Sequence, residues 1–186
     1  MKRREVLKSG LLASTMTVGL VGCHTQAKAN DMQMPKLKGK VNHSACKWCY
    51  SSIPLEQLAE HAQDIGLKSI ELLDPDEWKV VTDRGLTCAI SNGSPLGIIH
   101  GFNNKTLHDQ LRADIFPLIP EAAEQGVPQI ICFSGNRNGI SDKQGLENCA
   151  VGLEPLVKEA EKYNVKIVME LLNSNCLLYT SPSPRD

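Results

Sequence analysis

Two glutamates stand at the ends of short apolar runs, where a side chain can be held in a fixed position. Glu170 follows the apolar run 167–169, and Glu71 closes the segment "KSIE". A carboxylate fixed in this way can act as a general base or as a ligand for a hard divalent ion. The structural alternatives are that Glu170 is a solvated carboxylate and that Glu71 pairs with a neighbouring Lys or Arg.

Other polar or aromatic side chains follow the remaining predicted strands. The candidates for substrate binding are Trp48, Glu71, His100, Asn136, Arg137 and Asn173. Arg137 can hold substrate oxygens through its planar guanidinium, and Trp48 can offer its ring face to an apolar side of a ligand. The alternatives are that Arg137 is an ordinary surface residue, that Trp48 packs at a rim, and that His100 is a solvated loop histidine.

Further ionisable residues are expected to have structural roles. The histidines at positions 43, 61 and 108 are expected to be structural or exposed. The acidic residues Asp74, Asp76 and Glu77 precede a helical segment, where negative charge complements the helix dipole.

A repeated pattern predicts the elements that hold these side chains. The four segments "DIGLKSIELL", "DRGLTCAI", "EQGVPQIICF" and "KYNVKIVMEL" each contain a polar helix end, then Gly or Asn, then an apolar run. The residues Gly66, Gly85, Gly126 and Asn164 are expected to end helices in the left-handed conformation, and the aliphatic residue after each completes the cap. The runs that follow are apolar on both faces, as expected of strands covered by helices.

Helical spacing precedes three of these caps. Apolar residues recur at helical intervals over 55–65, 107–115 and 146–160, and Pro117 and Pro120 interrupt the helical region that starts at Leu107. With an initial strand at Lys40–Cys46, the chain is predicted to contain about five strands and four helices. Strands that alternate with helices predict a parallel sheet with right-handed crossovers.

Two architectures fit this alternation: an open doubly wound sheet and part of a (β/α)8 TIM barrel. No GxGxxG follows the first predicted strand, where the sequence is "CKWCYSSIP", and this argues against a dinucleotide-binding sheet. A whole barrel needs roughly 250 residues, and residues 39–174, just over half of that length, hold five predicted strands, which fits five of the eight strand–helix units. We therefore predict an α/β fold that is a partial TIM barrel, and in such barrels function collects at the carboxyl ends of the strands.

The first 29 residues predict an export signal. Residues 2–8 carry four basic side chains against one glutamate, and an apolar run from Gly10 to Gly22 follows. Its length falls short of the roughly 20 residues that span a bilayer, so a secretory signal is expected. The pair Arg3-Arg4 resembles a twin-arginine signal. The segment ending at Cys23 resembles a lipobox, and cleavage after Ala29 is the alternative. We expect export to the periplasm or cell envelope, with membrane anchoring if Cys23 is lipidated.

The cysteines do not predict a disulfide framework. The chain has 7 cysteines, of which Cys88 and Cys132 lie in apolar runs, where free Cys behaves as a small hydrophobe. Cys46 and Cys49 form a CxxC, but they lack the thioredoxin-like context of a redox motif, and packing at a strand end is the favoured interpretation. The net charge of −1 indicates no nucleic-acid partner.

The last residues do not continue the α/β pattern. Residues 176–186, "CLLYTSPSPRD", back-translate within codon degeneracy to a transposon-based sequencing adapter. We interpret them as a non-native tail, with secure native sequence ending at Ser174 and the barrel segment spanning 30–175. A natural Ser/Pro tail is the alternative.

Five segments in order resemble one family. The segments "CKWCY", "IELLDPDEW", "AISNG", "CFSGNRNG" and "MELLNS" together resemble the sugar isomerase/epimerase family with a xylose-isomerase-like barrel, in its hydroxypyruvate-isomerase-like branch. The resemblance covers Gly39–Ser174. It implies proton transfer next to a carbonyl through an enediolate, assisted by a divalent ion of the Mn, Mg or Co class. It also implies that Glu170 is the metal ligand and acid/base, with Asn173 behind it, and that later strands supply the other ligands.

The resemblance leaves three functions to distinguish. The leading expectation is a metal-dependent isomerase or epimerase of small sugars or hydroxy-ketoacids, with the 186-residue chain itself inactive. The alternatives are a non-catalytic carbohydrate-binding envelope lipoprotein and a metal-dependent endonuclease or dehydratase on the same barrel. The family's DNA-repair members use several His ligands on strands two to five, and this sequence shows no such set. The oligomeric state is left open.

Overall fold

The structure is a computed structural model that describes residue 39 and residues 41–172. The predicted export signal, Cys23, Asn173 and the tail 176–186 lie outside the described residues. Among the described helices, none is both long and apolar enough to cross a bilayer.

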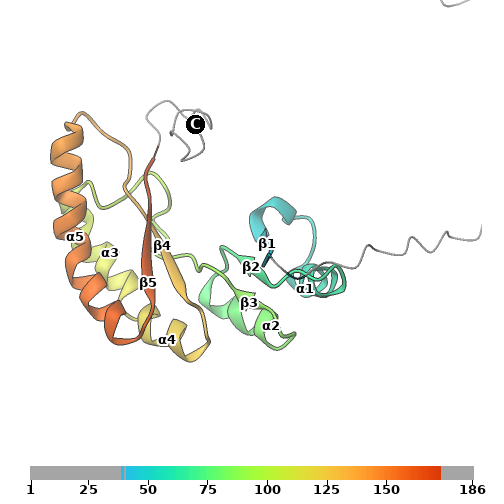
Figure 1. Cartoon of the computed structure of the whole chain (residues 1–186). Coiled ribbons are helices and arrows are strands. Elements are labelled where there is room, and N and C mark those ends of the chain that lie inside the picture. The colour runs from blue at the N-terminus through green and yellow to red at the C-terminus, as the bar shows by residue number, and fades with distance from the viewer. Residues whose placement is uncertain (1–38, 40, 173–186) are drawn as a thin grey trace, which may run out of the picture. The chain divides into compact units, whose positions relative to one another are not determined.

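Five short parallel strands follow one another in chain order, in one group of three and one of two (Figure 1). They are β1 (Ser44–Cys46), β2 (Ser69–Glu71), β3 (Thr87–Cys88), β4 (Gln129–Phe133) and β5 (Lys166–Glu170). β1 pairs with β2, β2 with β3, and β4 with β5. The first strand is shorter than the predicted Lys40–Cys46, while β5 has the predicted bounds.

Ser91 joins the two groups of strands. It bridges to Leu73 on one side and to Ile130 on the other. Its N–H donates to the Gln129 carbonyl at 2.9 Å, and its own carbonyl accepts from the Ile131 N–H at 2.9 Å. The strand succession of the described chain therefore runs from β1 to β5 without reversal, as the sequence predicts.

The helices follow the strands. They are α1 (Leu55–Asp64), α2 (Trp78–Thr82), α3 (His108–Ile115), α4 (Leu118–Glu124) and α5 (Asp142–Lys162), with short 3-10 helices η1 (Lys47–Tyr50), η2 (Pro75–Glu77) and η3 (Lys105–Leu107). The third predicted helical region is divided into α3 and α4 beside Pro117, the N-cap residue of α4. If α3 and α4 are counted as one region, the described helices form four regions, together with α1, α2 and α5.

Four helix ends share one cap. Gly66, Gly85, Gly126 and Asn164 have φ angles of 84°, 72°, 70° and 56°. The residue after each donates its N–H back to the helix, as in Leu67 to the Ala62 carbonyl at 2.8 Å and Val127 to the Ala122 carbonyl at 2.8 Å. This is the bonding of a Schellman motif, and it confirms the predicted caps.

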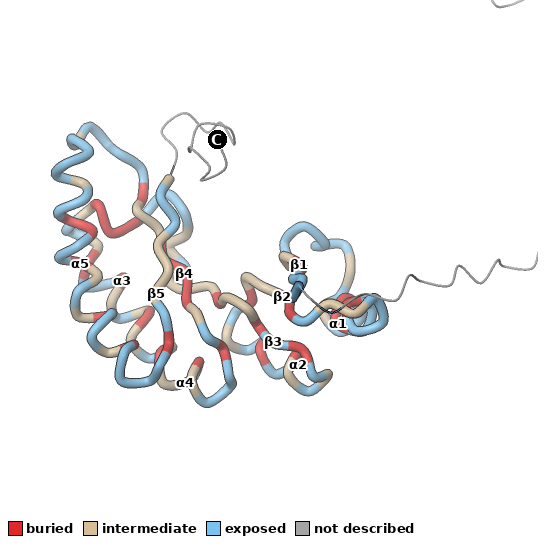
Figure 2. Tube along the Cα trace, viewed as in Figure 1, coloured by how far each residue is buried: buried red, intermediate tan, exposed pale blue. Residues whose placement is uncertain are grey.

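The core lies between the strands and the helices (Figure 2). Ile70, Cys88, Ile130 and Cys132 are buried on the helix-covered face of the sheet, together with Trp78 at the start of α2. Successive side chains of a strand alternate between faces, so Glu71, Ile131, Phe133 and Glu170 belong to the opposite face.

β5 differs from the prediction in its burial. The sequence predicts a strand buried on both faces, but none of its five residues is buried. Within the described residues β5 pairs with β4 alone, and Ile167 and Met169 pack against the core. One side of the strand therefore remains open.

Candidate functional site

The two candidate glutamates end parallel strands in the two groups that Ser91 joins, β1-β2-β3 and β4-β5. Glu170 is opposite Phe133 and Glu71 is opposite Cys46 in the strand register. The neighbours Met169 and Ile70 pack against the helix-covered core, so both glutamates belong to the face that the helices leave free. Glu71 is half-buried and Glu170 is exposed. The sheet thus presents two carboxylates on one face at its carboxyl edge.

These carboxylates do not form a metal site by themselves. In the part of the chain that the structure describes, no group of three or more His, Cys, Asp or Glu side chains is placed to hold a metal ion. Carboxylate oxygens suit a hard divalent ion, so the chemistry of the donors agrees with the expected metal. The number of donors is too small to hold the ion, and a complete site would need ligands from outside the described residues.

A chain of polar contacts ties the ends of β1, β2 and β3 together. Lys47, directly after β1, forms an ion pair with Glu77 of η2. Glu77 also accepts the Asp74 N–H at 3.0 Å, and Asn92 donates its side-chain amide to the Asp74 carboxylate at 2.8 Å. Asp74 and Glu77 form a capping box, which confirms their helix N-terminal role. The loops beside Glu71 are therefore held by side-chain contacts.

Trp48 and His100 are both exposed. Trp48 lies on η1 immediately after β1, and 69% of its surface is accessible. His100 lies in the loop between β3 and η3, beside the buried Gly101. The substrate-binding roles of Trp48 and His100 stay predictions. His108 is buried and its ring nitrogen lies 2.8 Å from the Phe102 carbonyl, in agreement with a structural role.

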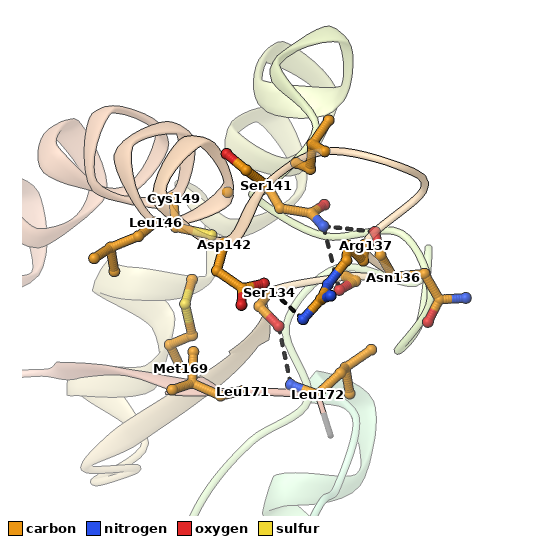
Figure 3. A pocket seen from close by; sticks show the side chains of 14 residues that line it. Ser134, Asn136, Arg137, Ser141, Asp142, Leu146, Cys149, Met169, Leu171 and Leu172 are labelled. Carbon is orange, nitrogen blue, oxygen red and sulfur yellow. Dashed lines mark hydrogen bonds and ion pairs between the residues drawn. The ribbon is translucent and has the colours of Figure 1, made fainter. Parts of the chain in front are cut away.

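Asn136 and Arg137 line an open groove of about 940 Å³ between the β4–α5 loop, α5 and the end of β5 (Figure 3). The groove is also lined by Leu146, Met169 and Leu171. Met169 faces the helices, and Glu170 is not among the lining residues. The groove therefore lies on the helix-covered side of the sheet, away from the face that carries the two glutamates.

Arg137 already has a partner. Its guanidinium lies 2.7 Å from the carboxylate of Asp142, the first residue of α5, and both side chains are exposed. A solvated ion pair of this kind contributes about 0–1 kcal/mol, so a ligand oxygen could replace Asp142 at little cost. The role of Arg137 in substrate binding stays a prediction.

Two buried asparagines, for which the sequence predicts no specific role, position this loop. Asn103 donates its side-chain amide to the carbonyls of Asn136 at 2.6 Å and Gly135 at 3.3 Å. Asn148 of α5 donates in turn to the Asn103 carbonyl at 2.7 Å. The Asn103 contact joins residues 33 positions apart in the sequence, and no local pattern in the sequence indicates such a contact.

Two glycines allow the same loops to approach. A Cβ added to Gly101 would lie 2.2 Å from the Gly135 nitrogen, and one added to Gly135 would lie 2.5 Å from the Gly101 nitrogen. The Phe102 N–H donates to the Phe133 carbonyl at 3.0 Å. The segment after β3 therefore runs along the end of β4 and fixes where the Asn136–Arg137 loop begins.

No protein-family model matches the chain, and no curated protein matches it in sequence. Among solved structures, the chain is similar to a family 2 AP endonuclease from Brucella melitensis, with a TM-score of 0.61 and 15% identity over 73% of this chain and 57% of that one. A D-psicose 3-epimerase solved with D-fructose gives a TM-score of 0.55 and 11% identity over 72% of this chain and 53% of that one. The D-psicose 3-epimerase from Clostridium cellulolyticum H10 solved with D-tagatose gives a TM-score of 0.56 and 14% identity over 72% of this chain and 53% of that one.

At these identities the similarity shows the fold alone. The chain is an α/β protein with parallel strands in the arrangement of a partial TIM barrel, as predicted. It spans just over half the length of each of the structures that it matches.

Proposed function

We propose that this chain supplies five strands of a metal-dependent isomerase or epimerase that acts on small sugars or hydroxy-ketoacids, in the manner of a hydroxypyruvate isomerase. The observation that carries the proposal is Glu170, a carboxylate at the carboxyl end of β5 on the helix-free face of the sheet. Function in TIM barrels collects at this edge. Glu71 on β2 provides a second carboxylate on the same face.

The structural neighbours support this class of reaction. Two of the three described above are named as D-psicose 3-epimerases, and they were solved with D-fructose and D-tagatose. Inversion at a carbon next to a carbonyl requires removal and return of a carbon-bound proton. A carboxylate such as Glu170 can perform this step, and a positioned general base contributes roughly 10²–10⁴-fold.

The proposed cofactor is a divalent ion of the Mn, Mg or Co class. When bound, such an ion lowers the energy of negative charge that develops on substrate oxygens. Glu170 would be one of its ligands, and the described residues do not complete the set. We therefore propose that the native sequence continues past Ser174 with strands that bring the missing ligands, and that the 186-residue chain alone is inactive.

The other predicted residues would bind substrate from the surrounding loops. Trp48 would place its ring against a sugar, and Glu71 would accept a hydroxyl hydrogen bond. Arg137 would have to exchange Asp142 for substrate oxygens, together with Asn136 on the same loop. His100 and Asn173 complete the set of candidates.

The test uses the product of the uninterrupted gene beside the 186-residue chain. Both are incubated with hydroxypyruvate and a panel of ketohexoses, with Mn²⁺, Mg²⁺ or Co²⁺ and after chelation. The proposal predicts metal-dependent turnover by the longer protein only. Glu170→Gln should remove about 10²-fold or more of the activity, whereas Glu147→Gln, on the exposed surface of α5, should leave it unchanged. Full activity of Glu170→Gln would refute the role of Glu170.

One observation favours a second function, a non-catalytic carbohydrate-binding lipoprotein. Trp48 is 69% exposed at the end of β1, as expected of a stacking platform. This alternative predicts sugar binding that Trp48→Ala abolishes, with no turnover by the longer protein under any metal condition.

We also propose that the protein is exported and anchored through Cys23. The supporting features are the basic and apolar segments within residues 1–29 and the lipobox-like residues that end at Cys23. Labelled palmitate should be incorporated into the wild type and not into Cys23→Ser. Incorporation into both would contradict the assignment.

A further inference from the structure

Cys46 and Cys49 lie at the two ends of one 3-10 turn that directly follows β1. Cys46 ends β1 and is the N-cap residue of η1, and Cys49 is the third residue of that helix. Three rises of about 2 Å along a 3-10 helix place Cα atoms three residues apart at about 6 Å, and Cys46, whose backbone is extended (φ −87°, ψ 120°), stands directly before the first turn. A disulfide needs Cα atoms roughly 4.4–6.8 Å apart. The local geometry thus matches a disulfide, although both thiols are free in the structure.

The pair also differs from the other described cysteines in access. Cys49 is exposed and Cys46 is half-buried, whereas Cys88, Cys132 and Cys149 are buried. A reagent in solution can reach Cys49 first and Cys46 through it. Packing at a strand end, the interpretation favoured from the sequence, therefore describes Cys46 but not Cys49.

The environment assigns different roles to the two sulfurs. Burial raises the pKa of the Cys46 thiol, and the neighbouring Cys49 and Glu71 add to the rise. Cys49 is the exposed sulfur of the pair and Cys46 is half-buried, so a disulfide in solution meets Cys49 first and Cys46 resolves.

We propose that Cys46 and Cys49 form a reversible disulfide at the carboxyl end of β1, with a low-molecular-weight disulfide as oxidant. The Cys49 thiolate attacks one sulfur of the oxidant, which forms a mixed disulfide and releases one small thiol. Cys46 gives up its proton to solvent and attacks the Cys49 sulfur, which releases the second small thiol. The two protein thiols lose two electrons in total, and the oxidant is reduced to two thiols.

The bond would close a loop around Lys47 and Trp48. Lys47 holds the Glu77 carboxylate, and Trp48 is exposed between the two sulfurs in sequence. Oxidation would therefore fix the conformation of η1 next to Glu71. This inference does not depend on the proposed catalytic function.

The test treats the full 186-residue chain with oxidised glutathione, blocks remaining thiols with iodoacetamide, and maps tryptic peptides. Cleavage after Lys47 separates Val41–Lys47, which contains Cys46, from Trp48–Lys68, which contains Cys49. We expect these two peptides to be joined by a disulfide that dithiothreitol breaks. We also expect Cys49 to react roughly tenfold or more faster than Cys149.

Three variants make the result specific. Cys46→Ser should keep glutathione on Cys49, Cys49→Ser should leave Cys46 largely reduced, and Cys149→Ser should form the disulfide as the wild type does. A wild type that keeps glutathione on Cys49 without closing would overturn the proposal. Equal reaction rates of Cys49, Cys88 and Cys149 would overturn it too, because the fold would then not select the pair.

Discussion

At the residue scale, two buried thiols make the free energy of unfolding depend on pH. Cys88 on β3 and Cys132 on β4 face the helices, and burial raises the pKa of each thiol to about 12 from its ordinary 9.0. The unfolded chain loses these protons near pH 9, while the folded chain keeps them. The stabilisation is therefore fully present below about pH 9 and is lost as the pH rises towards 12.

We predict that the free energy of unfolding falls by about 1 kcal/mol for each of these thiols between pH 9 and pH 10. Urea unfolding at both values measures it, and the double variant Cys88→Ala/Cys132→Ala should show a smaller fall than the wild type. Cys49→Ala, at an exposed position, serves as the control and should keep the wild-type fall. An identical pH dependence in all three proteins would contradict the prediction.

The sequence predicted individual residues where the pattern of a strand determines their position. The positions of Glu170 and the two buried cysteines follow directly from the alternation of side chains along a strand and from where the apolar runs end. The ion pair between Arg137 and Asp142 and the contact of Asn103 with Asn136 depend on how two loops meet. No periodicity encodes such contacts, so the sequence could not reveal them.

At the element scale, the left-handed caps decide where four helices end. Three of the four positions are glycine, and the fourth is Asn164 with a φ of 56°. A side chain with a Cβ in this conformation costs roughly 1–2 kcal/mol, and asparagine tolerates it better than most residues. Asn164 thus keeps α5 from extending into β5.

Two substitutions at Asn164 should distinguish the effect of backbone strain on stability from the effect of lost side-chain contacts. We expect Asn164→Ala to lower the free energy of unfolding by about 1 kcal/mol, and Asn164→Gly to be neutral or stabilising because glycine adopts this φ freely. Urea unfolding of both variants measures the difference. A loss of equal size in both would show that the amide side chain, not the backbone conformation, matters.

The contact between Gly101 and Gly135 should tolerate no added atom. Gly101→Ala places a methyl group 2.2 Å from backbone and should cost about 1–3 kcal/mol. In Gly145→Ala, within α5, the nearest atom is a flexible Ile140 carbon at 3.6 Å. That variant should gain about 0.5–1 kcal/mol from helix propensity. Thermal unfolding distinguishes the two, and a Gly101→Ala protein as stable as Gly145→Ala would contradict the described loop contact.

Helix and strand order was predictable because caps, prolines and apolar runs are local signals. The division of α3 from α4 followed from Pro117, whereas Pro120 lies within the first turn of α4. The 3-10 helices η1 and η3 were not predicted, since turns of three residues have no periodic pattern. The partial exposure of β5 was missed because burial depends on neighbours that a single strand does not specify.

At the scale of the whole molecule, apolar side chains remain exposed around α5 and β5. Leu146 is 70% exposed, Leu171 71% and Val151 55%, and in the described sheet β5 has one neighbouring strand. An unpaired strand edge with adjacent apolar surface promotes association. The partial barrel therefore carries a surface suited to a further strand and helix.

We predict that the 186-residue chain self-associates as its concentration rises, which sedimentation velocity measures. Leu146→Lys/Leu171→Lys should shift the distribution towards monomer. Ile98→Lys, at a position 53% exposed in the loop after β3, should not. A wild type that stays monomeric throughout would contradict the prediction.

Glu170 is proposed to move a proton at a carbon next to a carbonyl, and exchange of that proton with solvent reports the step itself. The uninterrupted gene product is incubated with a ketohexose or hydroxypyruvate in D₂O, and proton NMR follows the C–H signals beside the carbonyl. We predict that deuterium replaces hydrogen there with the wild type and not with Glu170→Gln. Exchange at the same rate with both proteins would contradict the claim.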